Sequence, residues 1–186
     1  MSVDPCFALS APDLRIVVER DRELARRWVT ARPQRFPVDS GGSWIQHDEW
    51  RCAAENVLAD LRLEMPRRRG CYVAASLPRL PFRDGAFALA LSGHFLFTYA
   101  DRLSSAFHRA ALRELLRVAE EVRVYPLRTH LDESAAWHPC LAEYLPGSGV
   151  RGQIVVVQPQ SDQADRHMLM LSRVGRGRSA GGCPGG

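Results

Sequence analysis

The spacing of hydrophobic residues along this chain of 186 residues changes near residue 70. Before that point, apolar side chains return every three or four positions over residues 12–32 and again between Ser43 and Leu61, which predicts two helices. After it, short apolar runs bounded by turn residues predict strands, and the helical spacing returns over residues 103–118. The predicted strands cover residues 71–75, 86–91, 121–127, 153–159 and 167–173.

The connections between the predicted strands indicate how they pair. Strands joined through a helix pair in parallel with a right-handed crossover, and residues 103–118 supply such a helix. The last two strands are joined by a segment too short for a helix, so we expect an antiparallel pair at one sheet edge. The pattern predicts an α/β protein with one domain over residues 1–174. A disordered, glycine-rich tail is expected over residues 175–186.

Composition and charge narrow the class of protein. Hydrophobic residues make up 46% of the chain and charged residues 25%, as in ordinary soluble domains. No apolar run approaches the ~20 residues of a membrane helix, and no signal-peptide pattern opens the chain, so we expect a cytoplasmic protein without membrane contact. The net charge of +4 comes mostly from arginine clusters, and only Tyr72 lies close to either of them as an aromatic residue, so nucleic-acid binding is not expected. The five cysteines are widely spaced, which predicts reduced thiols and no metal site.

Two sequence strings carry a family resemblance. They are "YVAASLPRLPFRDGAFALALSGHFLF", which begins at Tyr72, and "LRELLRVAEEVRVYPL", which ends at Leu127. These strings resemble the second half of class I S-adenosylmethionine-dependent methyltransferases. In that family a strand runs into an L-P-F segment and an acidic-Gly turn, and a second strand, a helix ending in E-L-L-R-V and a further strand follow. The resemblance implies a Rossmann-like sheet, S-adenosyl-L-methionine as cofactor, and methyl transfer to an acceptor that the sequence does not identify.

The resemblance also implies a cofactor site at the carboxyl ends of three strands. Asp4, in "SVDP", matches the acidic residue that ends the family's second strand and holds both ribose hydroxyls, since a carboxylate can accept two hydrogen bonds at once. Further cofactor-binding candidates are the adenine-slot residues Ser76 and Leu77, the latter through its backbone amide, and Ser92 and Gly93 after the next strand.

His94 is the candidate catalytic residue, because it follows the strand that ends at Gly93. It would contact the methionine moiety or act as a base toward a substrate hydroxyl or amine. The structural alternative is a histidine that caps the following helix and bonds a backbone carbonyl. Tyr99 and Asp101 come just after it and could face a substrate, with helix capping the expected role of Asp101. The outer, solvated side of that helix is expected to carry His108, Arg109, Arg113, Glu114 and Arg117.

Several departures from the family pattern bear on activity. The family's strands lie in the order 3-2-1-4-5-7-6, but no first strand or glycine-rich turn comes before Asp4. Ser76 and Ala88 stand where relatives carry aspartates, whereas Asp84 and Gly85 fit a purely structural turn. We therefore expect an N-terminally incomplete, truncated fold with two hypotheses for function. One is a methyltransferase, and the other is a non-catalytic remnant that acts as a protein-interaction module, with self-association through exposed sheet edges.

Overall fold

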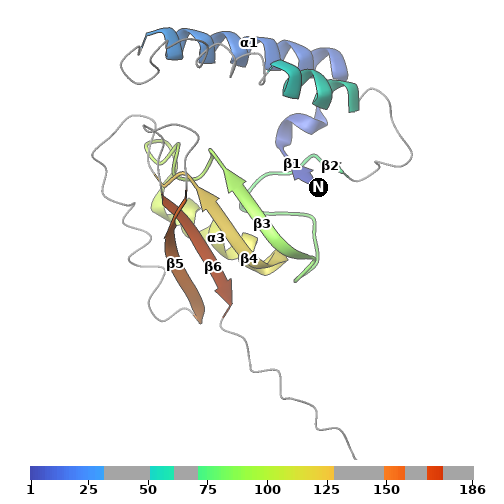
Figure 1. Cartoon of the computed structure of the whole chain (residues 1–186). Helices are drawn as coiled ribbons and strands as arrows, with labels where there is room; N and C mark the ends of the chain where they lie inside the picture. Colours follow the sequence, from blue (N-terminus) through green and yellow to red (C-terminus); the bar gives the residue numbers. More distant parts are fainter. Residues whose placement is uncertain (32–50, 61–70, 128–148, 158–166, 174–186) are drawn as a thin grey trace, which may run out of the picture. The chain divides into compact units, whose positions relative to one another are not determined.

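The computed structural model describes residues 1–31, 51–60, 71–127, 149–157 and 167–173, and it divides into two compact units, Met1–Ser76 and Leu77–Gly186 (Figure 1). The fold is α/β, with a two-stranded parallel sheet in the first unit and a four-stranded mixed sheet in the second. Across the described ranges, no helix has the length and apolar character needed to cross a membrane. The predicted disordered tail lies outside the described residues.

The first unit joins a short parallel sheet to two helical segments. Strand β1 (Ser2–Val3) pairs with β2 (Tyr72–Val73). After β1 the chain forms the 3-10 helix η1 (Pro5–Ala8) and then helix α1 (Ala11–Thr30). The Tyr72 hydroxyl donates to Asp60 Oδ2 at 2.8 Å, and its ring meets the edge of Phe7 with 5.2 Å between centroids. Tyr72 therefore ties β2 to η1 and to the helical residues 51–60.

Both helices predicted for the N-terminal part are present. Helix α1 begins where Ser10 Oγ accepts a 3.3 Å hydrogen bond from the backbone N–H of Asp13, the arrangement of an N-terminal cap. Residues 51–60 are helical, within the second predicted helix. The expected cap of that helix at Ser43 lies outside the described residues.

The second unit is a four-stranded sheet backed by one described helix (Figure 1). Its strands lie in the order β3-β4-β6-β5; β3 and β4 are parallel, and β6 is antiparallel to both of its neighbours. The predicted parallel pair and the antiparallel pair at the sheet edge are therefore confirmed. The elements are β3 (Phe87–Gly93), α3 (Ser105–Val118), β4 (Ala119–Tyr125), β5 (Val150–Val156) and β6 (His167–Arg173).

The core of this unit lies between α3 and one face of the sheet. Helical spacing puts an apolar stripe of α3 against alternate residues of the two central strands, because side chains of a strand point to opposite faces in turn. Burying this stripe is the main stabilising contribution to the unit. The most deeply buried members are Ala111, Leu112, Val122, Val124, Leu169 and Leu171.

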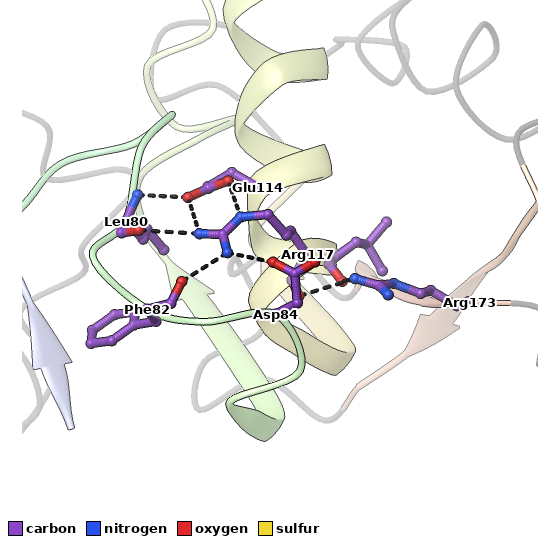
Figure 2. Close-up of polar contacts among 7 residues, drawn as sticks. Leu80, Phe82, Asp84, Glu114, Arg117 and Arg173 are labelled. Carbon is purple, nitrogen blue, oxygen red and sulfur yellow. Dashed lines mark hydrogen bonds and ion pairs between the residues drawn. The ribbon is translucent and has the colours of Figure 1, made fainter.

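Arg117, expected on the outer side of α3, instead fastens the segment before β3 to the helix (Figure 2). Its guanidinium donates to the carbonyls of Leu80 and Phe82 and pairs with Asp84 at 2.7 Å. Glu114 lies beside it, and its Oε1 accepts both an Arg117 N–H at 2.8 Å and the Leu80 backbone N–H at 2.6 Å. The hydrogen bonds to Glu114 and to Asp84 raise the pKa of Arg117 above its usual value.

Asp84 and Gly85 form a turn before β3, as predicted. Gly85 has φ +61°, a left-handed conformation that glycine adopts without steric cost, and its N–H donates to the carbonyl of Arg117 at 2.8 Å. From β6, Arg173 donates to the carbonyls of Leu116 and Arg117. The end of α3 is thus held from two sides (Figure 2).

Candidate functional site

Asp4 lies at the carboxyl end of the parallel pair β1–β2, where the sequence predicted a ribose ligand. Its backbone N–H donates to the carbonyl of Val73 at 3.2 Å, which extends the ladder by one bond. Its Oδ1 accepts the Cys6 backbone N–H at 2.7 Å, so Asp4 also caps η1. The side chain is exposed and its position is set by these two bonds.

The Asp4 carboxylate affects a neighbouring thiol. A side-chain hydrogen bond to Asp4 raises the pKa of Cys6, with partial burial and the negative charge of Asp4 acting in the same direction. In the Asp4→Asn variant the charge is removed while Oδ1 remains as a cap. We expect the Cys6 pKa to fall and iodoacetamide to alkylate Cys6 faster near neutral pH, since the thiolate is the reactive form. Peptide mass spectrometry would follow Cys6, with exposed Cys52 as the internal control; an unchanged ratio of the two rates would contradict the assignment.

The two adenine-slot candidates belong to different units. Ser76 is exposed and ends the first unit, and Leu77 begins the second. The Leu77 side chain is half-buried and packs against the core of the second unit. The structure therefore shows a packing role for the Leu77 side chain in the second unit.

The carboxyl end of β3 presents the remaining candidates together. Ser92 pairs with Val124, and Gly93 pairs with Tyr125. The His94 backbone N–H donates to the carbonyl of Tyr125 at 2.7 Å, and the two rings meet edge to face with 5.6 Å between centroids. His94 is exposed and has φ +50°, uncommon for a residue with a side chain. The chain thus turns sharply at His94 and leaves its ring on the surface.

Two expectations about the following helix are wrong. Helix α3 begins at Ser105, and its cap is Ser104, whose Oγ accepts the Phe107 N–H at 3.2 Å. Neither His94 nor Asp101 caps it. Residues after His94 instead form turns that bury Leu96, which is 0% exposed. Leu96 and Phe97 are both buried in the hydrophobic core, and the helix starts only after them.

The expectation that His108 is solvated is also wrong, since its side chain is 0% exposed. Its Nδ1 lies 2.9 Å from the carbonyl oxygen of Ser104, and its Nε2 lies 3.0 Å from that of Leu96. The ring also stacks on Phe97 with 5.2 Å between centroids. A signal was present in the sequence, because position 108 shares the helical stripe of Ala111, Leu112 and Leu115.

The described candidates therefore form two groups. Asp4 and Ser76 belong to the first unit, while Leu77, Ser92, Gly93 and His94 belong to the second. Asp4 lies at the carboxyl end of the β1–β2 pair, and Ser92, Gly93 and His94 lie at the carboxyl end of β3, the edge where α/β sheets bind ligands. Within the described ranges, no group of three or more His, Cys, Asp or Glu side chains has the arrangement of a metal site.

Comparison with known proteins gives one significant match. The chain is 35% identical over 80 residues to an uncharacterized protein of Methanocaldococcus jannaschii, and this match covers 43% of the chain and 36% of that protein. No family model matches the chain. No solved structure matches it.

Proposed function

We propose that this chain is a methyltransferase-like domain that binds S-adenosyl-L-methionine and transfers its methyl group to an acceptor. The strand order carries the proposal. With the first strand left out, the family order 3-2-1-4-5-7-6 leaves the two pieces 3-2 and 4-5-7-6. The sheets β2-β1 and β3-β4-β6-β5 have these orders, and β6, in the place of strand seven, is antiparallel to its neighbours.

The chemistry of the side chains is compatible with this role. Asp4 uses Oδ1 to cap η1, and a carboxylate has lone pairs left to accept ribose hydroxyls. His94 is exposed at the end of β3, with its backbone held by Tyr125, and could accept a proton from an acceptor hydroxyl or amine. The cofactor, when bound, supplies an already activated methyl group, so the protein's task is mainly alignment.

A second candidate function is that of a non-catalytic interaction module. Within the described part of the second unit, β3 is at the sheet edge, and its Leu89 and Leu91 side chains are 41% and 70% exposed. An apolar edge strand is a template for pairing with another chain. The sequence departures at Ser76 and Ala88 favour this alternative, because members of the methyltransferase family carry aspartates at these two positions.

Calorimetric titration of the purified chain with S-adenosyl-L-methionine, and with its demethylated product, tests the proposal. We expect saturable binding that Asp4→Asn weakens about ten- to hundred-fold, the range for a hydrogen bond to a charged group. Asp21→Asn is the matched control, since Asp21 is exposed on α1 and pairs with Arg20. Absence of heat from a folded sample would contradict the methyltransferase proposal and favour the interaction module.

A further inference from the structure

Exposed aromatic side chains gather on the turns that follow β3. Phe95 and Tyr99 are each 38% exposed, and their ring centroids lie 6.5 Å apart at a tilt of 58°. The Arg102 guanidinium lies over the Tyr99 ring, 5.7 Å from its centroid. We call Phe95, Tyr99 and Arg102 the aromatic platform.

The platform is fixed from beneath rather than carried on a loose loop. The intervening residues Leu96 and Phe97 are 0% and 1% exposed, so the segment is anchored in the core. The Tyr99 N–H donates to the Phe95 carbonyl at 3.1 Å, and the Leu103 N–H donates to the Tyr99 carbonyl at 3.0 Å. A surface already held in one conformation loses little entropy when a ligand binds.

The side chains of the aromatic platform favour planar ligands. Aromatic faces and a planar guanidinium both stack on flat π systems. Arg102 Nε lies 3.6 Å from Asp101 Oδ2, so the positive charge beside the platform is balanced by a carboxylate. Net charge therefore gives little preference for an anionic ligand, whereas ring stacking favours an aromatic one.

We propose that the aromatic platform binds a planar aromatic or heteroaromatic small molecule. The platform begins directly after His94, the candidate base, so the bound molecule would be the methyl acceptor. That last assignment, unlike the binding itself, rests on the proposed function. His108 acts as a positioning residue, because its ring nitrogens lie within hydrogen-bond distance of the carbonyls of Leu96 and Ser104.

The test uses two neutral probes of the same carbon skeleton, planar 2-naphthol and saturated decahydro-2-naphthol. Each is titrated into the full isotope-labelled chain without cofactor and followed by NMR. We expect 2-naphthol to shift the Phe95 and Tyr99 signals and to bind at least about ten-fold more tightly than its saturated counterpart. Equal affinity for the two probes would overturn the proposal, because general apolar contact does not distinguish them.

Variants test whether 2-naphthol binds at the aromatic platform. Tyr99→Leu should weaken 2-naphthol binding about five- to hundred-fold, the usual cost of losing one stacking partner. Leu91→Ser, at an exposed position of β3, should leave it unchanged, and an equal loss in that control would overturn the proposal. Phe95→Leu provides a second stacking variant if Tyr99→Leu does not fold. If 2-naphthol binds but titration with S-adenosyl-L-methionine gives no heat, the ligand-binding role of the aromatic platform is supported and the methyltransferase proposal is contradicted.

Discussion

Replacing His108 with leucine is expected to lower the free energy of unfolding by about 1–3 kcal/mol. The substitution keeps a similar volume but removes both ring nitrogens from the carbonyls of Ser104 and Leu96, which they meet at 2.9 and 3.0 Å. A buried polar group left without its partner costs about 1–3 kcal/mol. A single imidazole tautomer has one N–H and donates to one of the two carbonyls, and because the side chain is 0% exposed, water does not replace that lost bond in the folded state.

Denaturant titration of the full chain at neutral pH measures this loss. His94→Asn is the matched control, because His94 is exposed and asparagine tolerates its positive φ; we expect that variant to change stability by less than about 0.5 kcal/mol. Amide hydrogen exchange adds a local readout, since the N–H groups of Tyr99 and Leu103 should exchange faster in His108→Leu. Equal stabilities of the two histidine variants would show that the bonds of His108 are not stabilising.

The second large effect concerns Glu114 and depends on pH. The carboxylate is 13% exposed and accepts hydrogen bonds from the Leu80 backbone and from two nitrogens of Arg117, at 2.6–2.8 Å. Glu114→Gln should therefore cost about 2 kcal/mol at pH 7, the range for a hydrogen bond to a charged group. The variant loses the charge but keeps one acceptor oxygen.

The pKa of Glu114 sets the pH at which the stability difference between wild type and Glu114→Gln disappears. The hydrogen bond from Arg117 lowers the pKa of Glu114, helped by the Leu80 N–H and opposed by burial. A carboxyl whose folded pKa is depressed stabilises the protein fully above its unfolded pKa of about 4.3, and this contribution is lost as pH falls through the folded pKa. Wild type and Glu114→Gln should thus differ equally at pH 7 and pH 6 and converge toward pH 3.

Unfolding curves at these three pH values provide the measurement. Glu120→Gln is the control, since Glu120 is exposed on β4, and it should change stability little at any pH. A Glu114→Gln difference that persists undiminished at pH 3 would contradict the proposed role of the carboxylate charge. It would point to packing of the side chain instead.

The regular elements could be predicted from the sequence because local periodicity dictates them. Helix α1 and strand β3 both follow from the spacing of apolar residues within their own segments. The parallel pairing of β3 with β4 followed from the helix between them. The 3-10 turn after Asp4 has no such periodic signal and was not predicted.

The candidate site was less predictable, because its geometry depends on contacts between distant segments. Arg117 donates hydrogen bonds to carbonyls 35 and 37 residues earlier in the chain, and no local sequence pattern predicts this pairing. The start of α3 was misplaced for a similar reason. Burial of Leu96 and Phe97 requires turns before the helix, so Ser104 rather than Asp101 becomes the cap.

The sequence by itself determined the α/β class, the order of elements and the position of His94 at the end of a strand. These follow from side-chain periodicity, which acts over a few residues. Only the tertiary structure decided that His108 is buried and that Phe95 and Tyr99 are presented side by side at the surface. Burial and exposure of single residues depend on which segments pack together, and that packing is set by the whole core rather than by any one segment.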